Sequence, residues 1–273
     1  MSNYTVTYNG IADRSIGVHC VKRPSVPAPT AKVDVTDLRG VDGSYYNADG
    51  TYNDITIDVA FSLVSTDHSS LIAKPGDWMT LYRKVKQWLL SPGDGKLRFS
   101  DDYDIENGIK KYYYYKVKNV SLSNNRATRI MGELTASFTC DGYTYRDDGD
   151  VEMEIVSAAT ASTSDGVTTY SPGNAPSALT NNFSTCHPLF RLQGSGTVTI
   201  TVNGKEFAVT VNGTAYIDTD RMIVYNDAGE WVNFTAQGDY EDLWLCPGEN
   251  SFDVSYTATA PIYVWMTPRW RCL

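Results

Sequence analysis

The sequence lacks the features that secretion, membrane insertion and disulfide cross-linking require. No run of about eighteen apolar residues is present, so we expect no membrane-spanning helix. The segment Met1 to Tyr8 has neither a basic stretch nor an apolar core, so we expect no signal peptide. The five cysteines are odd in number and not closely spaced, which argues against a disulfide framework and for a reducing compartment. We therefore expect a protein that is made and assembled in a cytoplasm.

Basic residues are also few. The 273 residues include 23 Lys and Arg against 32 Asp and Glu, which gives a net charge of -9 and a pI near 4.8. Such a chain is a poor nucleic-acid binder, because affinity for a duplex comes largely from Lys and Arg on phosphates. Hydrophobic residues make up 42%, a globular composition, and the 19 Tyr and six Trp favour strands and subunit contacts.

Groups that could catalyse a reaction or bind a metal are sparse. There are three histidines, and two of them neighbour a cysteine, in His19-Cys20 and Cys186-His187. Adjacent residues of a strand point to opposite faces, so neither pair can act directly as nucleophile and base. No cysteine spacing matches a zinc site. We expect no catalytic residue, no metal site and no cofactor.

Carboxylates offer one further possibility for a metal. Asp102, Asp104 and Glu106 alternate as in a calcium-binding loop, but Asn107 and Tyr113 stand where that loop needs a glycine and a bidentate Glu. An ordinary acidic hairpin loop is the preferred interpretation.

Two short motifs could in principle belong to a hydrolase. Asp218 and Asp220 would suit a glycosidase only with a facing partner, so we expect a solvated pair. Gly194-Ser195-Gly196 lacks the glycine spacing of a nucleophile elbow and is interpreted as a turn.

One convincing helix is predicted, over residues 77–91. Asp77 is a good N-cap, and Pro92 disfavours helical geometry at Ser91, where the helix should end. Apolar residues recur at helical spacing and form one stripe that we expect to close a β-sandwich, namely Trp78, Leu81, Tyr82, Val85, Trp88 and Leu89.

The rest of the chain predicts short strands and turns. Residues 54–63 alternate cleanly, as in a half-buried antiparallel strand, and residues 16–21 are interpreted as an earlier short strand. Asn203-Gly204 marks a hairpin. Residues 160–182 are rich in Ser, Thr, Pro, Gly and Asn and predict a long surface loop.

These patterns predict a mainly β protein with two domains. The acidic run at residues 147–150 marks the boundary. We therefore predict a domain over residues 1–148, a β-sandwich that includes the helix 77–91, and a second β-sandwich or jelly roll over residues 149–273.

Residues 33–52 are long, turn-rich and not needed for a core. Asp42-Gly43 and Asp49-Gly50 are both turn dipeptides, so this segment is either one long hairpin or two tight loops.

Several short motifs follow one another along nearly the whole chain. In the N-terminal half they are Tyr8-Asn9-Gly10, Arg39-Gly40-Val41-Asp42-Gly43, Tyr52 before the strand 54–63, the Trp-rich helix, K-L-R-F-S-D-D (96–102) and S-F-T-C-D-G-Y (137–143). In the C-terminal half they are His187-Pro188-Leu189-Phe190, the Asn-Gly hairpin, Y-I-D-T-D (216–220), P-G-E-N (247–250) and P-R-W-R-C-L (268–273). In this order they resemble the distal tail protein (Dit) family of long, non-contractile-tailed phages, the siphoviruses.

This resemblance implies an N-terminal β-sandwich with one α-helix and an extended hairpin or belt, followed by a galectin-like β-sandwich. It implies a non-enzymatic hub of the tail tip or baseplate, a homohexameric ring that joins the tail tube protein to the tail-tip protein. Receptor-binding or baseplate proteins would sit at the rim, and DNA would pass through a central channel without specific binding. The expected location is the virion tail tip, after assembly in the host cytoplasm and without any membrane partner.

The segment 33–52 is the candidate ring contact in that interpretation. The residues that we expect to make the contact are Arg39, Val41, Asp42, Tyr45, Tyr46 and Tyr52.

Two other functions stay open. A carbohydrate-binding adhesion module would recognise a host-surface glycan through exposed Trp231, Trp244 or Tyr240, although buried aromatics are more common. A hydrolase would need an unexpected carboxylate pair, because no motif specifies an activity.

Overall fold

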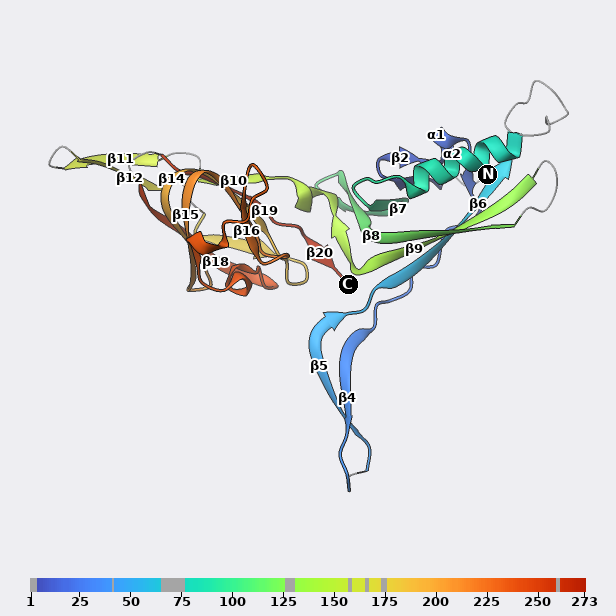
Figure 1. Cartoon of the computed structure of the whole chain (residues 1–273), viewed down its shortest axis with the longest axis horizontal. Coiled ribbons are helices and arrows are strands. Elements are labelled where there is room, and N and C mark those ends of the chain that lie inside the picture. The colour runs from blue at the N-terminus through green and yellow to red at the C-terminus, as the bar shows by residue number, and fades with distance from the viewer. Residues whose placement is uncertain are drawn as a thin grey trace. The chain divides into compact units, whose positions relative to one another are not determined.

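The computed structural model describes residues 4–40, 42–64, 77–125, 131–156, 159–164, 167–172, 176–258 and 261–273. The protein is mainly β, as predicted (Figure 1). It divides into two compact units, Met1–Tyr145 with Leu273, and Arg146–Cys272. The predicted boundary lay after residue 148. Among the described residues, no helix has the length and apolar character needed to cross a bilayer.

The elements of the first unit run up to its border with the second. In chain order they are β1 (Val6–Tyr8), β2 (Ile11–Ala12), α1 (Asp13–Ile16), β3 (His19–Cys20), β4 (Ala31–Asp37), β5 (Ser44–Tyr52), β6 (Ile55–Val64), α2 (Asp77–Leu90), β7 (Lys96–Glu106), β8 (Ile109–Asn125) and β9 (Met131–Arg146).

The second unit contains strands and short 3-10 helices. They are η1 (Asp147–Asp150), β10 (Met153–Val156), β11 (Ala159–Ser164), β12 (Val167–Pro172), β13 (Ala178–Asn181), β14 (Leu189–Val202), β15 (Lys205–Asp218), β16 (Ile223–Asn226), η2 (Asn233–Thr235), β17 (Ala236–Gln237), η3 (Tyr240–Leu243), β18 (Gly248–Ala258), β19 (Tyr263–Thr267) and β20 (Arg271–Cys272).

A curled sheet forms the body of the first unit, with the strand order β2-β1-β7-β8-β9-β6-β3. In β6, the alternate residues Ile57, Val59, Phe61 and Leu63 are fully buried, because successive strand residues point to opposite faces. Helix α2 runs along this face of the sheet in Figure 1 and shares its core. The alternating pattern of residues 54–63 therefore gives one wall of the core.

Helix α2 is one residue shorter than predicted, because it ends at Leu90 and not at Ser91. The Ser91 hydroxyl donates to the backbone carbonyl of Gln87, and Pro92 follows directly. A residue before proline is disfavoured in the helical conformation, so the backbone leaves the helix at Ser91.

The apolar stripe of α2 reaches the core through its C-terminal half. Val85, Trp88 and Leu89 are buried, Leu81 and Tyr82 are half-buried, and the side chain of Trp78 lies outside the described residues. The indole N–H of Trp88 donates to the carbonyl oxygen of Tyr8 at 3.0 Å. Trp88 also meets Phe61 edge-on, with 5.7 Å between ring centroids. This one side chain ties the helix to both β1 and β6.

The strand predicted over residues 16–21 is mostly absent. Residues Asp13–Ile16 form helix α1, and only His19–Cys20 pair with β6. Gly17 takes a φ of 88°, the left-handed conformation that ends a helix. The buried carboxylate of Asp13 accepts from the backbone N–H of Cys20 at 3.0 Å and so fixes this reversal.

In the second unit, β14 serves both layers of a sandwich. It pairs with β15 along its whole length, while its other edge pairs with β19 from Leu189 to Gln193 and with β18 from Gly196 to Val202. The change of partner occurs at residues 194–196. The predicted turn at Gly194-Ser195-Gly196 is therefore wrong, because this segment is a bend inside a strand.

The bend requires glycine for a steric reason. Gly194 has a φ of 147°, and a Cβ added there would lie 2.8 Å from Cγ1 of Ile262. Glycine in a strand commonly marks such a close approach of two segments.

The hairpin between β14 and β15 turns at Asn203-Gly204, as predicted. Both residues have positive φ, 51° and 78°, as a tight two-residue hairpin turn requires.

Residues 160–182 are not the long surface loop that composition predicted. β11 and β12 pair with each other, and β13 pairs with β18. The segment is rich in Thr and also contains Val, and β-branched residues fit the extended backbone of a strand.

Replacing Trp88 by Ala should lower the free energy of unfolding by about 3–5 kcal/mol, because the change leaves a cavity and removes the hydrogen bond from the indole to the Tyr8 carbonyl. Met79, on the same helix, is 40% exposed, and Met79→Ala should change that energy by about 0.5 kcal/mol or less. Denaturant unfolding followed by circular dichroism measures both variants. Equal losses would contradict the placement of α2.

Candidate functional site

The segment 33–52 is one long hairpin and not two loops. We call β4 and β5 together the arm. The two strands pair only with each other, as a two-stranded sheet. Figure 1 shows the arm leaving the body of the first unit, and every residue of β4 is exposed.

The arm has one apolar face. Val35 lies opposite Tyr46 and Val33 lies opposite Ala48, so these four side chains share that face. Val33, Val35 and Tyr46 are 44%, 53% and 65% exposed. An isolated two-stranded hairpin is marginally stable in water, so such a face gains stability when another surface covers it.

The structure separates the residues predicted to make the ring contact. Arg39 and Asp42 are exposed near the turn of the arm, and Val41 lies outside the described residues. Tyr45 pairs with Thr36 and so points to the face opposite Tyr46.

Tyr52 lies at the base of the arm. Its ring meets Tyr143 of β9 edge-on, with 5.7 Å between the ring centroids. It therefore anchors the arm to the body of the first unit.

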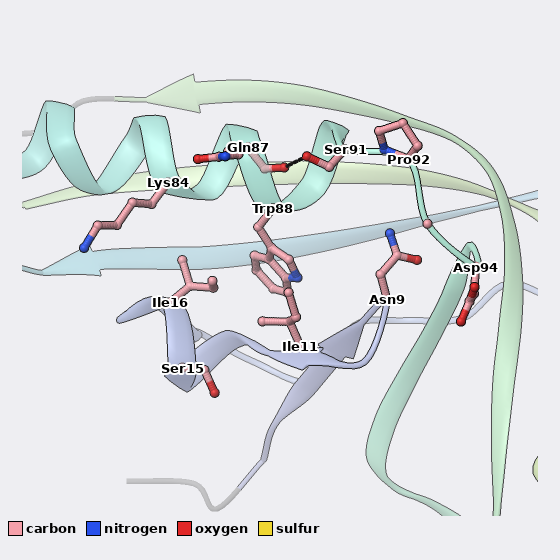
Figure 2. A pocket seen from close by; sticks show the side chains of 11 residues that line it. Asn9, Ile11, Ser15, Ile16, Lys84, Gln87, Trp88, Ser91, Pro92 and Asp94 are labelled. Carbon is pink, nitrogen blue, oxygen red and sulfur yellow. Dashed lines mark hydrogen bonds between the residues drawn. The ribbon is translucent and has the colours of Figure 1, made fainter.

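A hollow of about 500 Å³ lies beside α2 (Figure 2). Ile11, Ile16 and Trp88 contribute apolar surface, and Lys84 and Asp94 stand at opposite ends of the view. Its lining residues, all of them within the described ranges, include no histidine and no cysteine.

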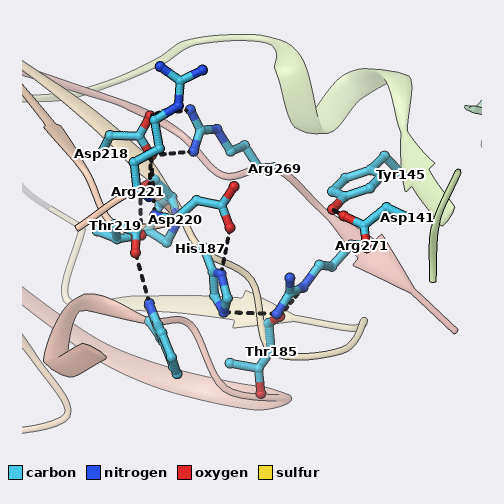
Figure 3. A network of polar contacts seen from close by, with 12 residues as sticks. Asp141, Tyr145, Thr185, His187, Asp218, Thr219, Asp220, Arg221, Arg269 and Arg271 are labelled. Carbon is cyan, nitrogen blue, oxygen red and sulfur yellow. Dashed lines mark hydrogen bonds and ion pairs between the residues drawn. The ribbon is translucent and has the colours of Figure 1, made fainter. Parts of the chain in front are cut away.

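In the second unit, His187 is held by three partners (Figure 3). Its Nδ1 lies 3.0 Å from the Asp220 carboxylate, and its Nε2 lies 2.8 Å from the guanidinium of Arg271. Because a guanidinium can only donate, Nε2 accepts, and the proton sits on Nδ1 and faces Asp220. Trp244 stacks on the ring, with 4.2 Å between the ring centroids. Both ring nitrogens are thus bonded, so His187 connects segments rather than moving protons.

The neighbouring cysteine does not complete a catalytic pair. Cys186 is fully buried, and its thiol donates to the carbonyl oxygen of Ser184 at 3.1 Å, whereas the side chain of His187 is 17% exposed. Burial raises the pKa of the Cys186 thiol to about 11, and it raises the pKa of the Cys20 thiol to about 11 as well. Both stay protonated at neutral pH, and a protonated thiol is a poor nucleophile.

Of the solvated pair predicted at residues 218 and 220, only Asp220 is exposed. Asp218 is only 2% exposed and accepts two hydrogen bonds from Arg269, at 2.7 and 3.1 Å. Burial raises the pKa of the Asp218 carboxyl, but the hydrogen bonds and charge of Arg269 outweigh burial and hold this pKa below its ordinary value. With Asp218 on Arg269 and Asp220 on His187, both groups have structural partners.

The acidic segment near residue 104 is the end of the β7–β8 hairpin, as the preferred interpretation expected. β7 runs to Glu106, and Asn107-Gly108 form a tight turn with φ of 51° and 78° before β8. The Tyr113 hydroxyl donates to Asp104 at 2.5 Å. Within the described ranges, no group of three or more His, Cys, Asp or Glu residues could hold a metal ion.

The aromatics proposed for glycan binding differ in exposure. Trp231 is 72% exposed. Trp244 is half-buried and stacks on His187, and half-buried Tyr240 packs on Phe207 with 5.1 Å between ring centroids. Of the three, Trp231 alone presents most of its side chain to solvent.

Sequence reasoning missed the network around His187 because its members lie far apart in the chain. Asp220 and Arg271 are 33 and 84 residues away from the histidine. The one local signal was the pair Arg269 and Arg271 in P-R-W-R-C-L, and the sequence did not indicate which residues they bind.

The fold has clear relatives among solved structures. The crystal structure of the Dit protein of phage SPP1, described as a paradigm of the hub of the adsorption apparatus in phages that infect Gram-positive hosts, covers 97% of this chain and 98% of its own. The sequences are 15% identical, and the TM-score is 0.56. The fold is that of a distal tail protein.

Two further solved structures match the chain at lower TM-scores. Chains of the activated baseplate of phage P2, with Ca and with Sr, cover 99% and 96% of this chain and 97% and 96% of their own, at TM-scores of 0.43 and 0.42 and identities of 10% and 9%. No protein-family model and no curated protein sequence matches the chain.

In this Dit fold, the Asp218–Arg269 ion pair should stabilise the protein above the ordinary pKa of an aspartate, about 4, and lose that effect as the pH falls through the lowered pKa. Asp218→Asn should cost about 3–5 kcal/mol at pH 7, because it leaves Arg269 without its buried partner.

Urea unfolding between pH 2 and 7 tests this expectation. Stability of the Asp218→Asn variant should depend less on pH below about 4 than that of the wild type. Asp253→Asn, at an exposed position, serves as the control and should leave the pH dependence unchanged. Parallel pH profiles of wild type and Asp218→Asn would refute the role of this pair.

Proposed function

We propose that this protein is a structural hub of a phage tail tip, in which copies of the first unit form a closed homohexameric ring. The ring joins the end of the tail tube protein to the tail-tip protein, and receptor-binding or baseplate proteins attach at its rim. DNA leaves through the channel without specific binding. The protein belongs to the virion, assembles in the host cytoplasm, needs no cofactor and catalyses no reaction.

The observation that carries this proposal is the arm, found on a chain with a Dit fold. Its apolar face includes Val35 and Tyr46, both more than half exposed. When the arm of one copy binds a different surface of the next, the contact is heterologous. Repeated heterologous contacts form a ring when the rotation between neighbouring copies closes. In such a ring the apolar face would form the contact between copies, whereas in a monomer it would stay exposed to solvent.

Charge supports passage of DNA. The net charge of -9 repels phosphates, so a nucleic acid crosses such a ring without being retained. The second unit, a galectin-like sandwich, then remains for contacts with other tail proteins, and we propose residues 149–273 for this role.

The arm contact predicts a change of oligomeric state. The double variant Val35→Asp/Tyr46→Asp should dissociate, with the hexamer weakened by about 100-fold or more, because two unpaired carboxylates would be buried at each contact. Light scattering behind size exclusion, over a range of concentrations, measures the mass.

A matched control comes from the other face of the arm. Thr36 and Asn47 point there, so Thr36→Asp/Asn47→Asp adds the same charge and should leave the hexamer intact. A wild type that is monomeric at every concentration would contradict the proposed ring. A ring that survives Val35→Asp/Tyr46→Asp would place the subunit contact elsewhere.

A further inference from the structure

One loop of the second unit presents two aromatic side chains to solvent. Trp231 and Phe234 are 72% and 86% exposed, the highest values for large hydrophobic side chains in the described part of the chain. They lie three residues apart between β16 and β17, around η2. We call residues 226–235 the aromatic loop.

The aromatic loop is held rigidly although its rings are exposed. The Asn226 side-chain oxygen accepts from the backbone N–H of Glu230 at 2.9 Å, and the backbone N–H of Asn226 donates to the Glu230 carbonyl at 3.0 Å. The Asn233 side-chain oxygen accepts from the backbone N–H of Val224 in β16 at 2.6 Å. A backbone tied at both ends loses little conformational entropy when its side chains bind.

The sequence that follows Arg221 and contains the two rings is acidic. Between Met222 and Leu245 the sequence has no Lys and no Arg, and it has five carboxylates, Asp227, Glu230, Asp239, Glu241 and Asp242. Lys205 of β15 meets Asp242 at 2.5 Å, while Asp227, Glu230, Asp239 and Glu241 are exposed. A complementary partner therefore carries positive charge around an apolar pocket.

We propose that the aromatic loop docks on a different protein of the tail tip, one that offers an apolar pocket bordered by Lys or Arg. This proposal rests on the proposed function as a hub. Trp and other aromatic residues contribute most of the binding energy at the centre of protein interfaces, and charged residues lie at the rim. The aromatic pair within an acidic border has this arrangement.

The polar groups of the loop favour a protein over a glycan. Sugar recognition needs side-chain amides and carboxylates free to bond hydroxyls beside an aromatic ring. Here the amide oxygen of Asn226 is bonded within the loop, and that of Asn233 accepts from Val224 of β16. The Asn226 side-chain N–H donates to the Glu230 carboxylate at 2.9 Å.

Hydroxyl-radical footprinting of the purified ring and of intact virions, read by mass spectrometry, tests the proposal. Trp231 and Phe234 should be oxidised readily in the free ring. In virions their oxidation should fall about tenfold or more, as full burial of an anchoring side chain requires.

A variant test complements the footprint. Virions that carry Trp231→Ala/Phe234→Ala should keep this protein but lose most of one other tail-tip protein. The control Ile105→Ala/Ile109→Ala removes two side chains of similar exposure, 67% and 61%, from the β7–β8 hairpin and should leave that composition unchanged.

The outcomes separate this inference from the hub itself. Absence of the chain from virions would overturn the hub and the docking loop together. Presence with equal oxidation of Trp231 in ring and virion would overturn the loop alone. Protection already in the free ring would assign the loop to contacts between copies. Virions of the Trp231→Ala/Phe234→Ala variant with complete tails but lost host adsorption would assign it to a glycan. Each of these last two results, protection in the free ring or lost adsorption with complete tails, would also overturn docking on another tail-tip protein.

Discussion

The alternation of side chains across β-strands is the constraint on which the rest of this structure depends. A core forms wherever a strand has an apolar face and a second layer covers that face. Strand β6 and helix α2 form such a core, in which Phe61 contacts Trp88. The arm obeys the same alternation but has no second layer. Its apolar face is therefore exposed in one copy of the chain.

The polar side chains around His187 and Asp218 bind one another and hold distant segments of the second unit together. His187 uses both ring nitrogens to bind Asp220 and Arg271, and Asp218 uses its charge on Arg269. These side chains are bonded to one another, which stiffens this part of the second unit. The proposed role as a hub would require a fixed position between other proteins, and rigid supports suit that role.

Much of the fold could be predicted because its signals are local. The alternation of residues 54–63, the stripe of α2 and the turn at Asn203-Gly204 each depend on neighbours within a few residues. The failures have a common cause. Gly194 bends a strand because Ile262, far along the chain, approaches it, and Gly17 ends a helix where composition suggested a strand. Asp218 was expected in solvent because its partner Arg269 is 51 residues away.

The sequence by itself determined the β class, the single long helix, the acidic charge and the order of motifs that resembles distal tail proteins, because composition and short-range periodicity carry this information. Only the tertiary structure decided that Tyr45 and Tyr46 point to opposite faces of one arm, that His187 is saturated with partners, and that Trp231 is exposed while Trp244 is not. These facts depend on register and on contacts between distant segments, which are fixed when the chain packs.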